Sequence, residues 1–172
     1  MQVFSQRETN LHTHSNYCNH AVGAIADYVK AAQTDGGLSV LGFTEHMPVP
    51  GDTLKDNMLT SELPMYVRDV RLEAESSKKL KIFLGGECDY FPSLMNYYNE
   101  ELLGKYGFDY LLFSIHLYHD QTENRLCHVS RSKDFVPYLS EYVKNYTTAL
   151  ESGMFLFGCH PDLYLSSLRH WD

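Results

Sequence analysis

Five short runs of apolar and small residues, each with a histidine or a glutamate near its end, constrain most strongly how this chain can fold. They are LHTHS (11–15), GFTEH (42–46), LGGEC (84–88), FSIH (113–116) and FGCHP (157–161). Such runs are typical of buried strands, and the stretches between them show the apolar spacing of helices. Alternating strands and helices build a parallel sheet with right-handed crossovers. The sequence therefore predicts an α/β fold with polar residues gathered at one edge of the sheet.

The apolar spacing also predicts the individual elements. We expect strands over residues 40–43, 80–84, 110–113 and 154–157, and helices over residues 22–35, 60–79, 92–106 and 133–151. In the last helix, Val143 and Leu150 are expected to face the core. Residues 47–59 are rich in proline, glycine and aspartate, which predicts a loop long enough to act as a lid or to set specificity.

Histidines and one glutamate at these strand ends are the candidate metal ligands. Residues two apart in an extended chain point the same way, so His12 and His14 are expected to present two imidazoles side by side. Glu87 ends an apolar strand after two glycines, where a carboxylate needs a cation or hydrogen-bond donors. His20 and His46 each have a plainer alternative, as a surface residue and as a strand-end histidine bonded to the backbone.

Composition narrows the class of protein further. A chain of 172 residues suits one domain with a real core. The net charge of −8 and the lack of a basic run argue against nucleic acid as a standing partner. Neither a membrane-spanning run nor a secretory signal is evident, so we expect a cytoplasmic protein. The four cysteines form no CxxC pair, and Cys88 and Cys159 are expected to point away from Glu87 and His160.

The set of motifs resembles the histidinol-phosphatase branch of the PHP superfamily (polymerase and histidinol phosphatase). The likeness covers the whole chain and rests on LHTHS followed by YCNHAVG, then GFTEHMPVP, LGGECDYFP, FSIH and FGCHPDLY. It implies a distorted (β/α)7 TIM-like barrel, of which residues 1–172 would supply about the first five strand–helix units as a single domain. The Asp-x-His motif of the family does not follow Asp162. We therefore expect a C-terminally incomplete chain: a fragment, a truncated gene product, or a chain completed by another.

The resemblance also implies a ligand set of up to three divalent transition metals (Zn, Fe, Mn or Co). His12 and His14 would bind the first metal, and Glu87 would bridge it to the second. His116 and His160 would complete the second site, and His20 with His46 would belong to the third. Glu87 would thereby act in catalysis, opposite a metal-bridging hydroxide that attacks phosphorus.

The implied reaction is hydrolysis of a small phosphate ester, L-histidinol phosphate, to L-histidinol and phosphate in histidine biosynthesis. No substrate-contacting residue is assigned, although Arg131 is a candidate phosphate clamp. Asp162 is a candidate either for accepting a hydrogen bond from the His160 ring or for capping its loop. His119, His128 and His170 match no metal motif and are expected to be solvated.

Three alternatives remain open from the sequence. The protein could be a related PHP phosphoesterase that acts on nucleotides or other small phosphate esters. It could be an inactive, metal-binding remnant, because the Asp-x-His motif is missing. It could also form a homo-oligomer in which a second copy completes the barrel.

Overall fold

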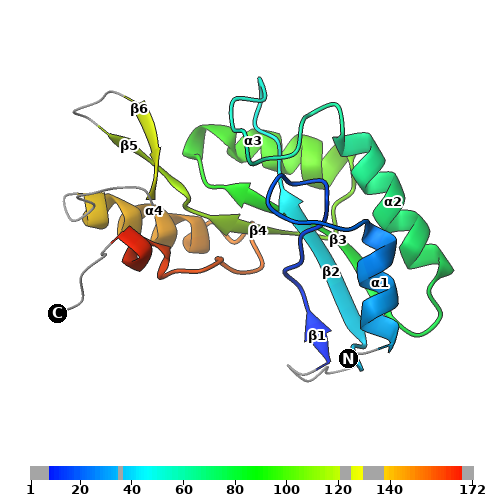
Figure 1. The fold of residues 1–172 in the computed structure, drawn as a ribbon. Coiled ribbons are helices and arrows are strands. Elements are labelled where there is room, and N and C mark those ends of the chain that lie inside the picture. The colour runs from blue at the N-terminus through cyan, green and yellow to red at the C-terminus, as the bar shows by residue number, and fades with distance from the viewer. Residues whose placement is uncertain (1–7, 35–36, 121–124, 130–137, 168–172) are drawn as a thin grey trace.

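A curled sheet of four parallel strands forms the centre of the computed structural model, which describes residues 8–34, 37–120, 125–129 and 138–167 (Figure 1). The strands lie in the order β1 (Thr9–Asn10), β2 (Val40–His46), β3 (Lys81–Asp89) and β4 (Tyr110–Ser114). Each neighbouring pair is parallel. The predicted α/β class is confirmed, and the sheet with its helices has the form of a partial TIM-like barrel.

The strand register brings the polar strand ends to a common edge. His46 lies opposite Glu87 where β2 pairs with β3, and Ser114 lies opposite Asp89 where β3 pairs with β4. β2 is buried along its whole length, and β3 is buried from Leu84 onward. A strand that is covered on both faces has a continuous run of apolar residues, and this is why the sequence predicts these two strands.

Helices α1 (Ile25–Thr34) and α2 (Leu63–Ser76) pack beside each other against the sheet (Figure 1). Their inward residues are Ile25, Val29 and Ala32 from α1 and Leu63, Tyr66 and Val70 from α2. Burial of each large apolar side chain of this kind stabilises the fold by about 1.5–3 kcal/mol. The two helices thus fix the sheet that carries the strand ends. No helix in the described ranges combines the length and the apolarity that a membrane span requires.

Tyr110 crosses the sheet toward the N-terminal segment over two glycines. A Cβ atom built at Gly42 or at Gly85 would overlap the Tyr110 side chain. The room left by these glycines lets the Tyr110 hydroxyl donate a hydrogen bond to the Leu11 carbonyl at 2.8 Å. Strand β4 therefore holds the residue that immediately precedes His12.

Several predicted elements differ from the observed ones. The segment 154–157 is not a strand, and only Gly158 forms an isolated bridge to Phe113 of β4. The expected helix over 92–106 is instead a 3₁₀ turn, η1 (Pro92–Leu94), a short α3 (Met95–Tyr97) and a π-helix, η2 (Tyr98–Lys105). A pattern of eight residues is too short to separate the two helix types, and the i→i+5 bond from Tyr106 N–H to the Glu101 carbonyl marks the wider turn.

The region after β4 was only partly predicted. An antiparallel hairpin of β5 (Leu117–Asp120) and β6 (Arg125–His128) was missed, because its residues mix polar and apolar types without a clear period. Helix α4 (Leu139–Glu151) exists, and hairpin and helix lie on the side of β4 away from β2 (Figure 1).

The predicted inner face of α4 was wrong by one position. Tyr142 and Ala149 are buried, whereas Val143 and Leu150 are 53% and 50% exposed. The Tyr142 ring packs against Tyr164 and Tyr146, and its hydroxyl reaches the Pro161 carbonyl at 3.2 Å, so an aromatic residue occupies the inner face. The first part of the expected helix, 133–137, lies outside the described residues.

Candidate metal centre

Glu87 lies at the centre of the predicted site residues. Its side chain is buried, and five histidine ring nitrogens lie within 3.7 Å of its two carboxylate oxygens. The contacts are His12 Nε2 at 3.1 Å, His14 Nε2 at 3.1 Å and His46 Nδ1 at 3.4 Å to Oε2, and His160 Nε2 at 3.1 Å and His116 Nε2 at 3.7 Å to Oε1. The sixth histidine, His20, has its ring centroid 4.8 Å from that of His14 and 4.7 Å from that of His46. All seven predicted residues therefore come together.

His12 and His14 reach the cluster from a segment that follows β1, because β1 ends at Asn10. Their Nε2 atoms are nevertheless only 3.1 Å apart, as the two-residue spacing predicted. Two hydrogen bonds join this segment to β2: Thr13 N–H donates to Thr44 Oγ1 at 3.1 Å, and Thr44 N–H donates to the Thr13 carbonyl at 2.8 Å.

A buried carboxylate on β2 holds the same segment from another side. The N–H and the hydroxyl of Ser15 both donate to Glu45 Oε1, at 2.7 and 2.5 Å. Glu45 precedes His46 on the strand and is fully buried. Glu45 is not among the predicted site residues, although a charged residue inside an apolar strand is a signal that points to it.

His160 is positioned without a regular strand. Cys159 N–H donates to the Phe113 carbonyl at 2.8 Å, and His160 itself has a positive φ of 28°. The Nδ1 atom of His160 is buried without a hydrogen-bond partner. The prediction that Asp162 accepts a hydrogen bond from this ring is therefore wrong.

The protonation states suit cation binding. Burial alone would raise the pKa of Glu87, but hydrogen bonds with His12, His14 and His160 outweigh it and hold that pKa well below its usual range. Burial lowers the pKa of His46 to about 3, and the neighbouring histidines add to the effect. Burial and the nearby His14 also lower the pKa of His20. An ionised carboxylate and neutral imidazoles are the forms in which these groups bind metals.

The distances among the donors fit a metal better than a hydrogen-bonded cluster. His12 Nε2, His14 Nε2 and Glu87 Oε2 form a triangle with all three sides 3.1 Å long. A neutral imidazole has one N–H, so two rings cannot satisfy three such contacts well by hydrogen bonding. Two ligand atoms about 2.0–2.1 Å from a tetrahedral zinc lie roughly 3.3 Å apart. The triangle therefore has the dimensions of a set of metal ligands.

Four groups of three donors could each hold an ion. In each group the ligand atoms lie within 4.8 Å of one another, and three of the groups share Glu87. The groups are His12, His14 and Glu87; His46, Glu87 and His116; Glu87, Cys159 and His160; and His14, Cys18 and His20.

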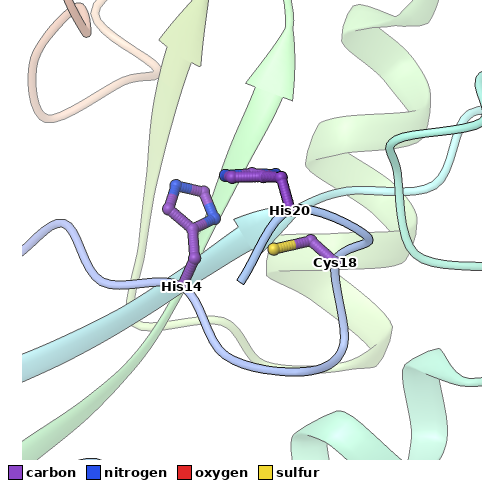
Figure 2. A group of neighbouring side chains, drawn as sticks. All are labelled: His14, Cys18 and His20. Carbon is purple, nitrogen blue, oxygen red and sulfur yellow. The ribbon is translucent and has the colours of Figure 1, made fainter. Parts of the chain in front are cut away.

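Two cysteines are closer to this cluster than the sequence suggested. Figure 2 shows Cys18 beside His14 and His20, and its Sγ donates to the Ser15 carbonyl at 3.4 Å. The prediction that Cys159 turns away from His160 is wrong, because strand alternation does not apply where no strand forms. Burial raises the pKa of both thiols, with the charge of Glu45 adding to it at Cys18 and that of Glu87 at Cys159. Both groups thus remain protonated beside the histidine and carboxylate donors.

The structure tests only some of the predictions for the remaining histidines and the candidate phosphate clamp. His119 is exposed, as predicted. His128 is half-buried instead of solvated, because its ring stacks on His116 with centroids 5.7 Å apart. Arg131 and His170 lie outside the described residues.

A parallel half-barrel with a histidine cluster around one glutamate at its carboxyl edge defines an α/β protein with a metal-type donor site. The PHP domain family model matches residues 10–171, and the chain belongs to this family. The resemblance noted from the motifs is thereby confirmed.

Individual relatives agree with this assignment. The chain is 36% identical over 107 residues to the "Probable histidinol-phosphatase" of Deinococcus radiodurans, a match that covers 61% of this chain and 40% of the relative. Among solved structures, the hisK protein of Listeria monocytogenes is similar with a TM-score of 0.72 and 18% identity, over 91% of this chain and 67% of that one.

A second solved structure is the histidinol phosphate phosphatase of Lactococcus lactis in complex with Zn, L-histidinol and phosphate. It is similar with a TM-score of 0.62 and 22% identity, over 95% of this chain and 66% of that one. At these identities the two structures support the fold alone. The chain spans less than half of the Deinococcus relative and about two thirds of the two solved chains.

Proposed function

We propose that this chain carries the metal centre of a phosphomonoesterase that hydrolyses L-histidinol phosphate to L-histidinol and phosphate, a step of histidine biosynthesis. The observation that carries the proposal is the convergence of five imidazole nitrogens on the buried Glu87 carboxylate within a PHP domain. The names of the Deinococcus and Lactococcus relatives support the choice of substrate.

The proposed ligand assignment is the one that the likeness to the PHP family implies, and the contacts to Glu87 support it. His12, His14 and Glu87 would hold one ion, and Glu87, His116 and His160 a second, so that the glutamate bridges the two. His20 and His46 would belong to a third site, with ring centroids 4.7 Å apart. His46 Nδ1 also lies 3.4 Å from Glu87 Oε2.

The chain's own groups provide charge and order for this chemistry. Glu87 supplies the anionic ligand, and the His46 ring, whose pKa burial lowers, offers a lone pair without adding charge repulsion. Divalent metals bound here would make hydroxide available at neutral pH and neutralise charge on the phosphoryl oxygens. Imidazole and carboxylate ligands suit Zn, Fe, Mn and Co alike. The zinc in the Lactococcus complex makes zinc the first metal to test.

Phosphate release from a panel of esters tests the substrate. The full chain, loaded in turn with each of the four metals, is assayed with L-histidinol phosphate, nucleotides and sugar phosphates. We expect the highest kcat/KM for L-histidinol phosphate. Equal rates for all esters would instead indicate a general phosphoesterase, and bound metal without any turnover would indicate an inactive metal-binding protein.

A further inference from the structure

Besides Glu87 and Glu45, a third buried carboxylate lies next to the cluster, in contact with His116. Asp89 follows Glu87 by two residues on β3, and its side chain is 4% exposed. Its Oδ1 atom lies 2.9 Å from Nδ1 of His116. Its Oδ2 atom accepts a hydrogen bond from Asn57 Nδ2, so both oxygens of this buried carboxylate have nitrogen partners, as an ionised carboxylate requires.

The charge of Asp89 decides which nitrogen of His116 carries a proton. An ionised carboxylate can only accept hydrogen bonds, so Nδ1 of His116 must donate. In a neutral ring the lone pair then sits on Nε2, which lies 3.7 Å from Glu87 Oε1 and faces the cluster. Ser114 Oγ lies 2.9 Å from the same Nδ1, but a hydroxyl both donates and accepts and cannot impose a tautomer.

Asn57 holds the other oxygen of Asp89. Its Nδ2 donates to Asp89 Oδ2 at 3.0 Å and to the Met47 carbonyl at 2.7 Å, so both of its hydrogens are used. Asn57 is buried, although it belongs to the segment 47–58, whose residues 50–53, 55 and 56 are exposed.

The segment 47–58 is tied to the strand ends at both of its termini. Met47 N–H donates to the Glu87 carbonyl at 2.9 Å, and Met58 N–H donates to the His46 carbonyl at 3.0 Å. With Asn57 added, the segment contacts the backbone of two candidate ligands and the side chain that orients a third.

We propose that Asp89 and Asn57 are positioning residues of the metal centre. Asp89 fixes His116 with Nε2 toward the cluster, and Asn57 fixes Asp89 and couples it to the segment 47–58. Carboxylates that receive the second N–H of a metal-binding histidine raise metal affinity by about 10–100-fold. This inference rests on the proposed function, because it assumes that His116 binds a metal.

Zinc binding to the full chain tests the effect on affinity. Asp89→Asn removes the charge at constant size, and Asn57→Ala removes the support for Asp89. By equilibrium dialysis we expect Asp89→Asn to weaken one zinc site by about 10–100-fold, and Asn57→Ala to weaken the same site by a smaller factor. Asp109→Asn is the matched control, because Asp109 pairs with Arg71 just before the amino end of β4, at the other end of that strand from His116. Wild-type zinc affinity in Asp89→Asn would overturn the proposal.

The tautomer of His116 gives a second, independent test. In the metal-free wild-type chain at about pH 8.5, ¹⁵N shifts of His116 are expected to show a proton on Nδ1, and Asp89→Asn is expected to shift the ring toward Nε2–H. A wild-type ring protonated mainly on Nε2 would overturn the proposal even if Asp89→Asn failed to fold. If the wild-type chain bound no zinc, the proposed function would fail. The ¹⁵N result would still show whether Asp89 fixes the tautomer of His116.

Discussion

Glu87 is the single residue on which the site depends most. It is the only acidic side chain shared by three of the four donor groups found among the described residues. Its two oxygens contact five imidazoles that come from four segments of the chain, because His12 and His14 share one segment. Loss of its charge would leave those rings without an anionic partner, and the site would bind cations far more weakly.

We predict that Glu87→Gln removes phosphatase activity and weakens zinc binding by at least about 10-fold. The amide keeps the size of the side chain but carries no charge and cannot bridge two ions. Phosphate release and equilibrium dialysis measure the two effects. The matched control is His119→Ala, which alters an exposed ring outside the cluster and is expected to retain both properties. Normal turnover by Glu87→Gln would contradict the mechanism.

The lowered pKa of His46 predicts a pH dependence of stability for the metal-free protein. The ring titrates near 6.5 when unfolded and at about 3 when folded, so between these values the unfolded chain binds more protons. The free energy of unfolding should therefore fall as the pH is lowered, by about 1–2 kcal/mol between roughly pH 6.5 and pH 5. His20 adds to this direction. His116, whose pKa is raised, binds more protons in the folded state near pH 6.5, so it opposes this slope there and adds nothing well below pH 6.5.

Urea unfolding in the presence of a chelator, at several pH values, measures this slope. His46→Gln lacks the titrating ring and is expected to show a smaller loss of stability on acidification than the wild type. Identical slopes for the two proteins would show that His46 is not the responsible group.

Among the structural elements, the strand ends could be predicted from the sequence. The segments between them could be predicted only in part. LGGEC and GFTEH each place a ligand-type residue at the end of an apolar run, and both runs are strands in register. The FGCHP run brings His160 to the site without forming a strand, because hydrogen bonds to β4 replace regular pairing. Asp89 could have been predicted as a site residue, because it follows Glu87 by two positions and residues two apart on a strand share a face.

Other features depend on contacts that no local pattern encodes. Asn57 reaches Asp89 across 32 positions in the sequence, and Tyr110 reaches Leu11 across 99. The face of α4 was misjudged because both Val143 and Tyr142 suit a core, and only the packing partners decide between them. Sequence periodicity ranks such positions but does not locate their partners.

Tyr110→Phe tests how β4 supports the segment that carries His12 and His14. Loss of the hydroxyl leaves the Leu11 carbonyl without this donor, which should lower the free energy of unfolding by about 1 kcal/mol and weaken zinc binding. The control is Tyr28→Phe, which removes a similar bond to the Val22 carbonyl on the exposed side of α1. We expect Tyr28→Phe to leave zinc affinity unchanged. An equal effect of the two variants on zinc binding would show that the Tyr110 bond does not position the histidines.

At the scale of the whole molecule, the metal centre links parts of the chain that share few other contacts. The donors come from segments as distant as His12 and His160, and the backbone of residues 156–159 hydrogen-bonds to β4. Ions bound by these donors would join the N-terminal segment to the region after β4. Bound metal should therefore stabilise the fold as a unit.

We predict that chelation lowers the melting temperature and that zinc restores it. A ligand that binds only the folded state at about 100 times its Kd adds roughly 2.7 kcal/mol to the free energy of unfolding. Thermal unfolding with EDTA, and again after addition of zinc, measures the difference. The Glu87→Gln variant should show a much smaller zinc-dependent shift, and a shift of wild-type size in that variant would place the stabilising metal elsewhere.

The histidines around Glu87 are expected to bind divalent metal together. A crystal structure of the full chain grown with zinc, with anomalous data collected at the zinc edge, tests this most directly. We predict anomalous peaks about 2.0–2.2 Å from Glu87 and from nitrogens of His12, His14, His116 and His160. An anomalous map with no peak in contact with Glu87 would contradict the account.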